Sequence, residues 1–208
     1  MILAKNIYKK FKEPVLKGVN LQAKAGEIIG LAGENGSGKS TLLEIITGLM
    51  PADSGSIEIE GTIGYVPQET ALFDNLTVRD NLKFWASAYD APWDNAEFDK
   101  SFLSKKVSQL SGGMKKRLSI SLACLHQPNL LVMDEPSAAL DIGFKGHLSQ
   151  MLADIKAQGR TVIFSSHQAD ELLWCDRIYI LREGVFVYEG DPREVESLPA
   201  ILYGRAGD

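Results

Sequence analysis

Short apolar runs broken by glycine-containing turns characterise the first third of the chain. Residues 16–22 and 28–32 are rich in aliphatic and β-branched side chains, which predicts two neighbouring strands. A stripe with the spacing i, i+3, i+4 and i+7 then predicts a helix, which Gly48 and Pro51 would end. The stripe consists of Leu42, Ile45, Ile46 and Leu49. Two further runs are predicted to form a strand pair: residues 56–59 and 62–66.

The pattern changes in the middle of the chain. Thr77-Val78-Arg79-Asp80 offers a capping box for a helix that Pro92 and Trp93 would break. A weaker helical pattern follows from about Asn95 to Leu103. We therefore interpret residues 68–127 as a mostly helical insert.

Buried strands return in the last third, at residues 130–133 and 161–165. Strands that alternate with crossover helices predict an α/β fold with a mainly parallel sheet covered on both faces. Residues 178–181 and 185–188 predict a closing hairpin. The crossover helix between the two buried strands carries an apolar stripe of Leu148, Met151, Leu152 and Ile155.

Composition narrows the class of protein. The 208 residues include 45% hydrophobic and 24% charged side chains, as in an ordinary soluble domain. The net charge of −5 provides no chain-wide positive field for a nucleic-acid partner. Cys124 and Cys175 stand alone, which is typical of a reduced compartment such as the cytosol. No run reaches the roughly 18 to 20 apolar residues of a membrane span, and we expect no export signal.

A nucleotide-binding pattern lies between the second predicted strand and the first predicted helix. Residues 33–41, GENGSGKST, match G-x-x-x-x-G-K-[ST] in the strand-to-helix context that this pattern requires. Backbone N–H groups of such a loop surround phosphate oxygens, and the helix N-terminus adds positive charge. Lys39 would contact the β- and γ-phosphates and Ser40 would bind Mg²⁺. The predicted nucleotide ligands are Asn35, Gly36, Ser37, Gly38, Lys39, Ser40 and Thr41.

Two acids end the buried strand at residues 130–133. Ligands collect at the carboxyl ends of parallel strands, so Asp134 and Glu135 are expected beside the phosphate loop. Asp134 would orient Mg²⁺ or its water, while Glu135 reaches an attacking water. The alternative is an ordinary strand end before a turn, because Pro136 and Ser137 follow directly.

Leu110-Ser111-Gly112-Gly113-Met114 resembles the signature motif of the ATP-binding-cassette (ABC) ATPases, the nucleotide-binding subunits of ABC transporters. Gln68 resembles their Q-loop, residues 137–141 their D-loop, and Ser165-Ser166-His167 their switch-histidine loop, all in family order over nearly the whole chain. The resemblance implies a P-loop NTPase core with a mainly parallel sheet and an N-terminal antiparallel β portion. It also implies one domain, with residues 68–127 as a helical subdomain inserted into a core of residues 1–67 and 128–208.

The resemblance also implies roles for individual residues. Ser111 is a good N-cap, and Gly112 and Gly113 leave the first N–H groups of its helix uncovered, which makes a second anion site. This site would face the γ-phosphate bound by another subunit, with Asp141 nearby, so that two ATP molecules are held in a head-to-tail dimer. His167 would contact the γ-phosphate and hold the attacking water, and Gln68 would touch Mg²⁺ or water.

The resemblance further implies that an aromatic residue near the N-terminus holds the adenine. Phe11 is preferred over Tyr8, and either could instead pack at a sheet edge. The run Lys115-Lys116-Arg117 is interpreted as a solvated helix face, with a contact to nucleotide or partner as the alternative.

Two residues depart from the family pattern, and the insert is short. Met114 replaces the usual glutamine, as in exporter-type subunits that pair with separate membrane proteins. Ala139 stands where glycine is common, so a left-handed backbone there would cost about 1 kcal/mol or more. The short insert between Gln68 and Ser111 leaves the membrane-facing contact open.

The predicted activity is Mg²⁺-dependent ATP hydrolysis coupled to transport by a separate membrane subunit, with export favoured. The chain would work as a homodimer, or a heterodimer with a related ATPase, on the cytoplasmic face of the cell membrane. Leu72, Phe73 and Leu76 would dock on the membrane subunit or else form the core of the insert. The competing functions are a soluble ABC ATPase that acts on ribosomes or DNA, and a small-molecule kinase.

Overall fold

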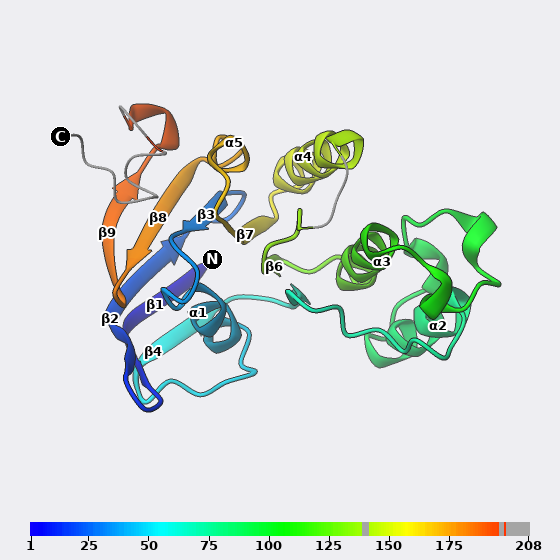
Figure 1. Cartoon of the computed structure of the whole chain (residues 1–208), viewed down its shortest axis with the longest axis horizontal. Coiled ribbons are helices and arrows are strands. Elements are labelled where there is room, and N and C mark those ends of the chain that lie inside the picture. The colour runs from blue at the N-terminus through cyan, green and yellow to red at the C-terminus, as the bar shows by residue number, and fades with distance from the viewer. Residues whose placement is uncertain (139–141, 196–197, 199–208) are drawn as a thin grey trace.

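The strands of the computed structural model, which describes residues 1–138, 142–195 and 198, form two sheets (Figure 1). The antiparallel sheet has the order β2-β1-β4, and the larger sheet has the order β5-β6-β7-β3-β8-β9. The strands are β1 (Ile2–Lys10), β2 (Pro14–Ala23), β3 (Ile28–Ala32), β4 (Ser54–Ile59), β5 (Ile63–Val66), β6 (Leu130–Met133), β7 (Thr161–Ser166), β8 (Arg177–Arg182) and β9 (Val185–Gly190).

The larger sheet is parallel except at one edge. β5, β6, β7, β3 and β8 pair in parallel, and β9 returns antiparallel to β8. Every residue of β3, β6 and β7 is buried, because helices or the second sheet cover both faces. The predicted α/β class, parallel sheet, antiparallel β portion and closing hairpin are therefore confirmed.

The helices divide between the two faces of this sheet and a separate helical region. Leu42 and Ile46 of α1 pack in one cluster with apolar side chains of both sheets, whereas Leu148 and Leu152 of α4 pack in a second cluster on the parallel sheet. The helices are α1 (Lys39–Ile46), α2 (Val78–Ala88), α3 (Gly112–Cys124), α4 (Ile142–Ala157) and α5 (Ala169–Leu172).

Residues 72–125 have a hydrophobic core of their own. It is built from α2, α3 and short 3-10 turns, with Val78, Leu82, Val107, Leu118 and Leu122 at its centre. Figure 1 shows α2 and α3 set to one side of the sheets. α3 reaches the sheet edge at Gly64, where an added Cβ would lie 2.3 Å from the carbonyl oxygen of Ala123. The helix backbone therefore lies directly on β5.

The capping box of α2 is confirmed. The hydroxyl oxygen of Thr77 accepts a hydrogen bond from the Asp80 amide at 3.1 Å, and Asp80 Oδ2 accepts one from the Thr77 amide at 3.4 Å. Two of the N–H groups that a helix start leaves unpaired are thereby satisfied.

The predicted pairing of residues 56–59 with 62–66 is wrong. β4 pairs with β1, and β5 pairs with β6 in the other sheet. Asn129 explains the separation, because its Oδ1 accepts a hydrogen bond from the Thr62 amide at 2.9 Å. The same oxygen lies so close to Gly61 that a Cβ at this position would be only 2.2 Å away. Gly61 adopts φ 91°, which turns the chain from one sheet to the other.

Two helix predictions also need correction. α1 ends at Ile46, three residues before the end of the predicted stripe. Gly48 has φ 76°, and the Leu49 amide donates a hydrogen bond to the Glu44 carbonyl. Leu49 is therefore 67% exposed and does not join the core. The weak helix predicted near residues 95–103 is replaced by 3-10 turns at Trp93–Asn95 and Lys100–Phe102. The Asp99 side chain accepts from the Ser101 amide and thereby caps the second turn.

Candidate functional site

Four neighbouring strands carry the predicted site residues at their carboxyl ends. In the order β5-β6-β7-β3, the strands lead into Gln68, then Asp134 and Glu135, then His167, then the phosphate loop. The parallel register places Val66 beside Met133, Met133 beside Phe164, and Ser166 beside Ala32. Segments distant in the sequence are thereby brought to one edge of the sheet, as the strand-end argument predicts.

The phosphate loop, residues 33–41, combines left-handed glycines with an uncapped helix. Gly36 and Gly38 adopt φ 80° and 107°. Gly38 is the N-cap of α1 and makes no side-chain cap, so the first N–H groups of the helix face outward without a competing acceptor. Ser37 Oγ is buried and has no hydrogen-bond partner among the described residues. Asn35 and Gly36 are exposed, and Ser40 and Thr41 are half-buried in the first turn of α1. This geometry suits an anion.

Lys39 is held inside this loop. Its Nζ donates to the carbonyl oxygens of Gly33 and Glu34 at 2.8 and 2.9 Å, and the residue is 5% exposed. Burial lowers the pKa of Lys39, while the nearby charges of Glu135 and Asp134 act in the opposite direction. The lysine and the two acids therefore belong to one electrostatic site.

Ser165 joins the two acids. Its hydroxyl donates to Asp134 Oδ1 at 2.5 Å and accepts from the Glu135 amide at 2.9 Å. Ser165 is fully buried and Asp134 is 2% exposed. Glu135 has φ 45°, a left-handed conformation that is uncommon for a residue with a side chain. The hydroxyl thus holds a strained strand end in one conformation.

His167, which follows β7, lies close to the carboxylate of Glu135. Its Nδ1 is 3.4 Å from Glu135 Oε1, with side-chain exposures of 44% and 14%. The imidazole is therefore accessible from outside while the carboxylate is largely covered. Both groups are available to a ligand at the edge of the sheet.

A buried glutamate supports the histidine loop from behind. Glu171 in α5 is 1% exposed, and its Oε2 accepts from Ser166 Oγ at 2.6 Å. Ser166 Oγ in turn accepts from the Gln168 amide at 3.0 Å. Lys145 of α4 lies 2.9 Å from Glu171 Oε1 and donates to the Gln168 side chain at 2.5 Å. The residues on both sides of His167 are thereby tied to α4.

The interpretation of residues 115–117 as a solvated face is wrong for Lys116. This side chain is 3% exposed, and its Nζ donates to the carbonyl oxygens of Pro67, Gln68 and Asp134 at 2.9, 3.1 and 3.3 Å. Lys115 agrees better with the prediction, because it pairs with Asp74 at 2.6 Å near the surface. Arg117 packs 4.0 Å from the centre of the Phe144 ring.

The predicted signature residues lie apart from the phosphate loop of the same chain. Ser111 is the N-cap of α3, and its Oγ accepts from the Met114 amide at 3.3 Å. Ser111 and Gly112 are exposed and Gly113 is half-buried. Within the part of the chain that the structure describes, no hydrogen bond or ion pair joins residues 111–113 to residues 33–41. Asp141 and Ala139 lie outside the described residues.

Gln68 and Phe11 are both accessible. Gln68 follows β5, with an exposed side chain and a carbonyl held by Lys116.

Phe11 lies in the turn between β1 and β2 and is 55% exposed, with Lys9 Nζ 5.6 Å from its ring centre. Tyr8 is 47% exposed, but its hydroxyl lies against Gly18 of β2, 2.6 Å from an added Cβ. The tyrosine thus packs along the sheet, which leaves Phe11 as the better adenine candidate.

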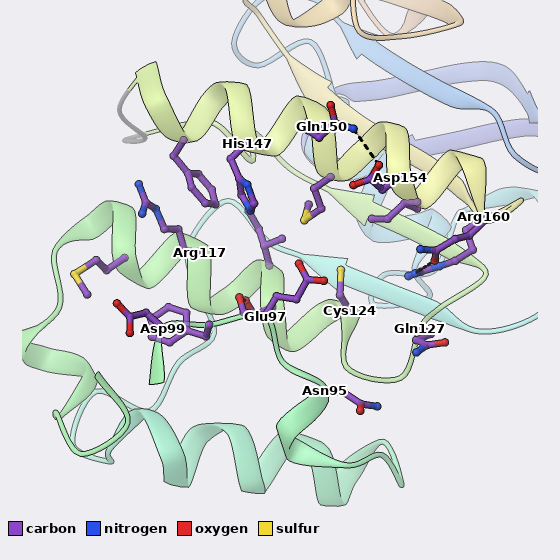
Figure 2. Close-up of a pocket in the computed structure, with 18 of the residues that line it drawn as sticks. Asn95, Glu97, Asp99, Arg117, Cys124, Gln127, His147, Gln150, Asp154 and Arg160 are labelled. Atoms are coloured by element: carbon purple, nitrogen blue, oxygen red, sulfur yellow. Dashed lines mark hydrogen bonds between the residues drawn. The ribbon is translucent and has the colours of Figure 1, made fainter. Parts of the chain in front are cut away.

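Two cavities lie outside this site. One of about 460 Å³ separates α3 and the segment around residues 95–102 from α4, and Figure 2 shows Gln150 bonded to Asp154 on its α4 side. It contains none of the predicted site residues. The other, about 450 Å³, is lined by apolar side chains that include Leu49, Leu72 and Trp85. It opens beside the Q-loop.

Sequence reasoning assigned no supporting role to three residues: Ser165, Lys116 and Glu171. Ser165 could have been found from its place at the end of a buried strand next to the one that carries Asp134. Lys116 and Glu171 gave no signal, because a charged residue in a helix is usually solvated. Their burial depends on the tertiary packing of α3 and α5.

Comparison with known proteins gives consistent matches. A family model described as "ABC transporter" matches residues 16–138. The linearmycin resistance ATP-binding protein LnrL of Bacillus subtilis (strain 168) is 36% identical over 221 residues, which cover 95% of this chain and 71% of that protein. The Nod factor export ATP-binding protein I of Burkholderia lata is 33% identical over 212 residues, covering 90% of this chain and 70% of that protein.

Solved structures agree with the sequence matches. Two dimeric structures of MJ0796, a bacterial ABC transporter cassette, superpose with TM-scores of 0.84 and 0.82 at 28% identity. Each covers 94% of this chain and 100% of the other, and the second is a post-hydrolysis state bound to ADP and Pi. Across residues 1–138, 142–195 and 198, no helix combines the length and hydrophobicity that a bilayer crossing needs.

Proposed function

Because the chain belongs to the ABC transporter family of ATPases, we propose that it hydrolyses ATP at the interface of a head-to-tail dimer and thereby powers export through a separate membrane subunit. One observation carries this proposal: Lys39, Glu135 and His167 meet at one sheet edge beside a loop that suits phosphate. A cationic group for the phosphates and a carboxylate for the attacking water are two of the parts that transfer of a phosphoryl group to water uses.

Each polar group at the sheet edge has a part in hydrolysis. Lys39, fixed by two carbonyl oxygens, directs its remaining donor toward the β- and γ-phosphates. Glu135 accepts a proton from, or orients, the attacking water, and His167 holds the γ-phosphate and that water in line. Ser165 keeps the Glu135 backbone where its carboxylate can reach the water.

The oxygen atoms beside the loop suit Mg²⁺, which prefers hydroxyl, carboxylate and amide oxygens. The Ser40 hydroxyl, the Asp134 carboxylate and the Gln68 amide are the residues that would hold it. The Asp134 carboxylate is already oriented by Ser165. When bound, the cation would neutralise charge that develops on the phosphate oxygens.

The exposed start of α3 supports the dimer. Ser111 and Gly112 present helix N–H groups to solvent, away from the chain's own phosphate loop, so we infer that they bind the γ-phosphate of a second subunit, with Asp141 beside them. Residues 68–127 would then act as a helical subdomain that carries this anion site.

Glu135→Gln tests the catalytic role and the dimer together. This variant keeps the side-chain shape, so ATP binding is retained while turnover falls by roughly 10² to 10⁴. Light scattering after gel filtration should show a dimer with ATP and Mg²⁺ and a monomer with ADP. A monomer under both conditions contradicts the dimer, and hydrolysis at the wild-type rate removes Glu135 from its role.

A mixing experiment tests the head-to-tail arrangement more sharply. Lys39→Ala disables the phosphate loop of one chain, and Ser111→Arg blocks the anion site of another. Each variant alone should be inactive, but a mixed dimer combines the intact phosphate loop of one chain with the intact α3 of the other. Phosphate release should therefore recover on mixing. Absence of recovery, with both variants folded, contradicts shared sites.

The 450 Å³ cavity beside the Q-loop supports contact with a membrane subunit. Phe73 and Leu76 are 41% and 40% exposed, and Leu72 lines the cavity together with Leu49. Phe73 packs edge-on against Phe84 at 4.8 Å, which fixes an aromatic surface near Gln68. Exposed apolar side chains gathered in this way are typical of an interaction site.

Co-purification of a hydrophobic protein from detergent-solubilised membranes tests the docking. Phe73→Asp should abolish it and leave the basal ATPase activity within about twofold, because a surface substitution leaves the fold intact. Val187→Asp, a substitution at a 46% exposed position on β9, is the matched control and should leave co-purification unchanged. If the Phe73→Asp variant still co-purifies with the partner, the contact with the membrane subunit lies elsewhere on the chain.

Export is favoured over import by two observations. Met114 stands at the end of the signature sequence, and the relatives described above include a Nod factor export protein and a linearmycin resistance protein. Action on ribosomes or DNA is disfavoured by the net charge of −5. The chain would work at the cytoplasmic face of the membrane as a homodimer or with a related ATPase.

A further inference from the structure

Lys116 occupies an unusual place for a lysine. It lies in the second turn of α3 and is 3% exposed. An ammonium group has three N–H donors, and here backbone carbonyls accept all three. A buried cation with a complete set of acceptors is strongly held, because any movement leaves the charge or a carbonyl without its partner.

The three acceptors come from two strand ends that the site needs in register. Pro67 and Gln68 follow β5, and Asp134 follows β6. Gln68 and Asp134 are also two of the three residues assigned to Mg²⁺ above. Because Nζ bonds to the backbone of both residues, it fixes the relative position of the amide and the carboxylate that those backbones carry.

The same lysine also sets the direction of α3. The C-terminal end of the helix rests on β5, where Ala123 approaches Gly64. Lys116 is seven residues earlier, about 10 Å along the helix axis, and about one and a half turns from Ser111. Two points along a helix define its axis, so the contact at Lys116 determines where the exposed N-terminus points.

We propose that Lys116 is a positioning residue that couples the orientation of α3 to the metal-holding arrangement of Gln68 and Asp134. Engagement of the α3 N-terminus by the phosphate of a second subunit would be transmitted through Nζ to the three carbonyls that it holds. This inference rests on the proposed ATPase function, and it adds a physical link between the anion site of one nucleotide and the metal site of the other.

Metal affinity provides a readout separate from turnover. Mn²⁺ binding to the full chain with a non-hydrolysable ATP analogue can be followed by electron paramagnetic resonance. In Lys116→Met the Mn²⁺ affinity should fall about 10-fold to 100-fold, as for other residues that orient metal ligands. Binding of a fluorescent ATP analogue in EDTA should stay within about twofold, since Lys116 does not reach the phosphate loop. The value of kcat should fall and KM should change little.

Lys115→Met is the matched control, because it removes a neighbouring ammonium from the same helix turn. That lysine forms a single surface ion pair with Asp74, and such pairs contribute little. Mn²⁺ affinity and kcat should remain within about twofold of wild type. An equal loss in both variants would mean that general charge, not the carbonyl contacts, is responsible, and would overturn the proposal.

A double-variant cycle with Gln68→Ala separates positioning from stability. If Lys116 acts through Gln68, the loss of Mn²⁺ affinity in the double variant should be clearly smaller than the product of the two single losses. A purely structural lysine would give independent effects, which would contradict the proposal. Lys116→Gln, which keeps two N–H donors, carries the same test if the methionine variant does not fold. Its Mn²⁺ affinity should lie between those of wild type and Lys116→Met.

The wild-type chain distinguishes this inference from the proposed function. If wild type neither binds nor hydrolyses ATP, the proposed function fails and this inference fails with it. If wild type hydrolyses ATP and the folded Lys116 variants keep wild-type Mn²⁺ affinity, only the role of Lys116 is refuted.

Discussion

Nδ1 of His167 lies 3.4 Å from Oε1 of Glu135, although the two residues follow different strands of the parallel sheet. The contact depends on the register of β6 with β7, which sets Met133 beside Phe164. A water molecule or phosphate oxygen at the sheet edge can therefore meet a carboxylate and an imidazole together. This is the arrangement that general acid–base chemistry requires.

His167→Ala is expected to slow ATP hydrolysis by roughly 10² to 10⁴ and to leave ATP binding nearly unchanged, because the phosphate loop is intact. Phosphate release and titration with a fluorescent nucleotide measure the two effects. His147→Ala, which removes an exposed imidazole from α4, is the control and should keep wild-type turnover. Equal rates for both variants would show that His167 has no part in the reaction.

Ser165→Ala should lower both stability and turnover. It leaves the buried Asp134 carboxylate and the Glu135 amide without their shared hydroxyl, which costs about 1 to 3 kcal/mol of unfolding free energy. Urea unfolding measures the loss, and Ser108→Ala at an exposed position should change stability by less than about 0.5 kcal/mol. If Ser165→Ala has wild-type stability, another group must satisfy these two polar atoms.

ATP affinity should depend on the charge of Lys39. Burial lowers the pKa of this lysine from the ordinary value of 10.5. The charges of Glu135 and Asp134 raise the pKa but do not cancel the effect of burial. The free protein therefore loses the ammonium at a lower pH than an exposed lysine would. Since triphosphate binds the charged form, affinity should begin to fall below pH 10.5 as the pH is raised.

Lys39→Ala provides the comparison. It should bind a fluorescent ATP analogue much more weakly at neutral pH and should show little further loss in alkaline solution. Circular dichroism at each pH confirms that the fold persists. Parallel pH profiles for wild type and variant would assign the alkaline loss to some other group.

The first third of the fold illustrates what a linear pattern can specify. The phosphate loop was predictable because glycine spacing, a preceding strand and a following apolar stripe all agree locally. The separation of β4 from β5 was not, because it depends on Asn129, which is distant in sequence and meets Gly61 only in the folded chain. Leu49 was misassigned for a different reason, since the left-handed Gly48 ends the helix before the stripe does.

In the candidate site, too, some residues could be predicted from the local sequence and others depend on tertiary contacts. Lys39, Asp134 and Glu135 lie in short segments whose residue types indicate their chemistry directly. Lys116 acts through hydrogen bonds to backbone atoms that follow β5 and β6, so its place in the sequence carries no signal. Ser165 is marked only by its position at the end of a buried strand. Supporting groups of this kind become visible only when burial and hydrogen-bond partners are known.

The two thiols are expected to be poorly reactive in the folded protein. Burial raises the pKa of Cys175 well above 9.0, with Asp176 and Glu171 adding to the effect, and burial raises the pKa of Cys124 to about 11. At pH 8 an aromatic disulfide reagent should label Cys175 only after denaturation, and Cys124 slowly at most. Rapid labelling of both thiols in native protein would contradict this burial.

The same shifts have a consequence for stability. In the unfolded chain these thiols ionise near 9.0, whereas the folded chain holds them neutral to higher pH. Their contribution is thus fully present below pH 9.0 and is lost for Cys124 as the pH rises through about 11. Cys124→Ala should show a smaller alkaline loss of unfolding free energy than wild type in denaturant titrations.

The left-handed backbone of Glu135 has a further meaning. Such a conformation costs about 1 to 3 kcal/mol for a residue with a side chain, and glycine or asparagine would relieve much of it. Selection for heat resistance alone would therefore favour removal of the acid that we propose acts on the attacking water. Fold stability and the proposed turnover therefore make opposite demands on the residue at this turn.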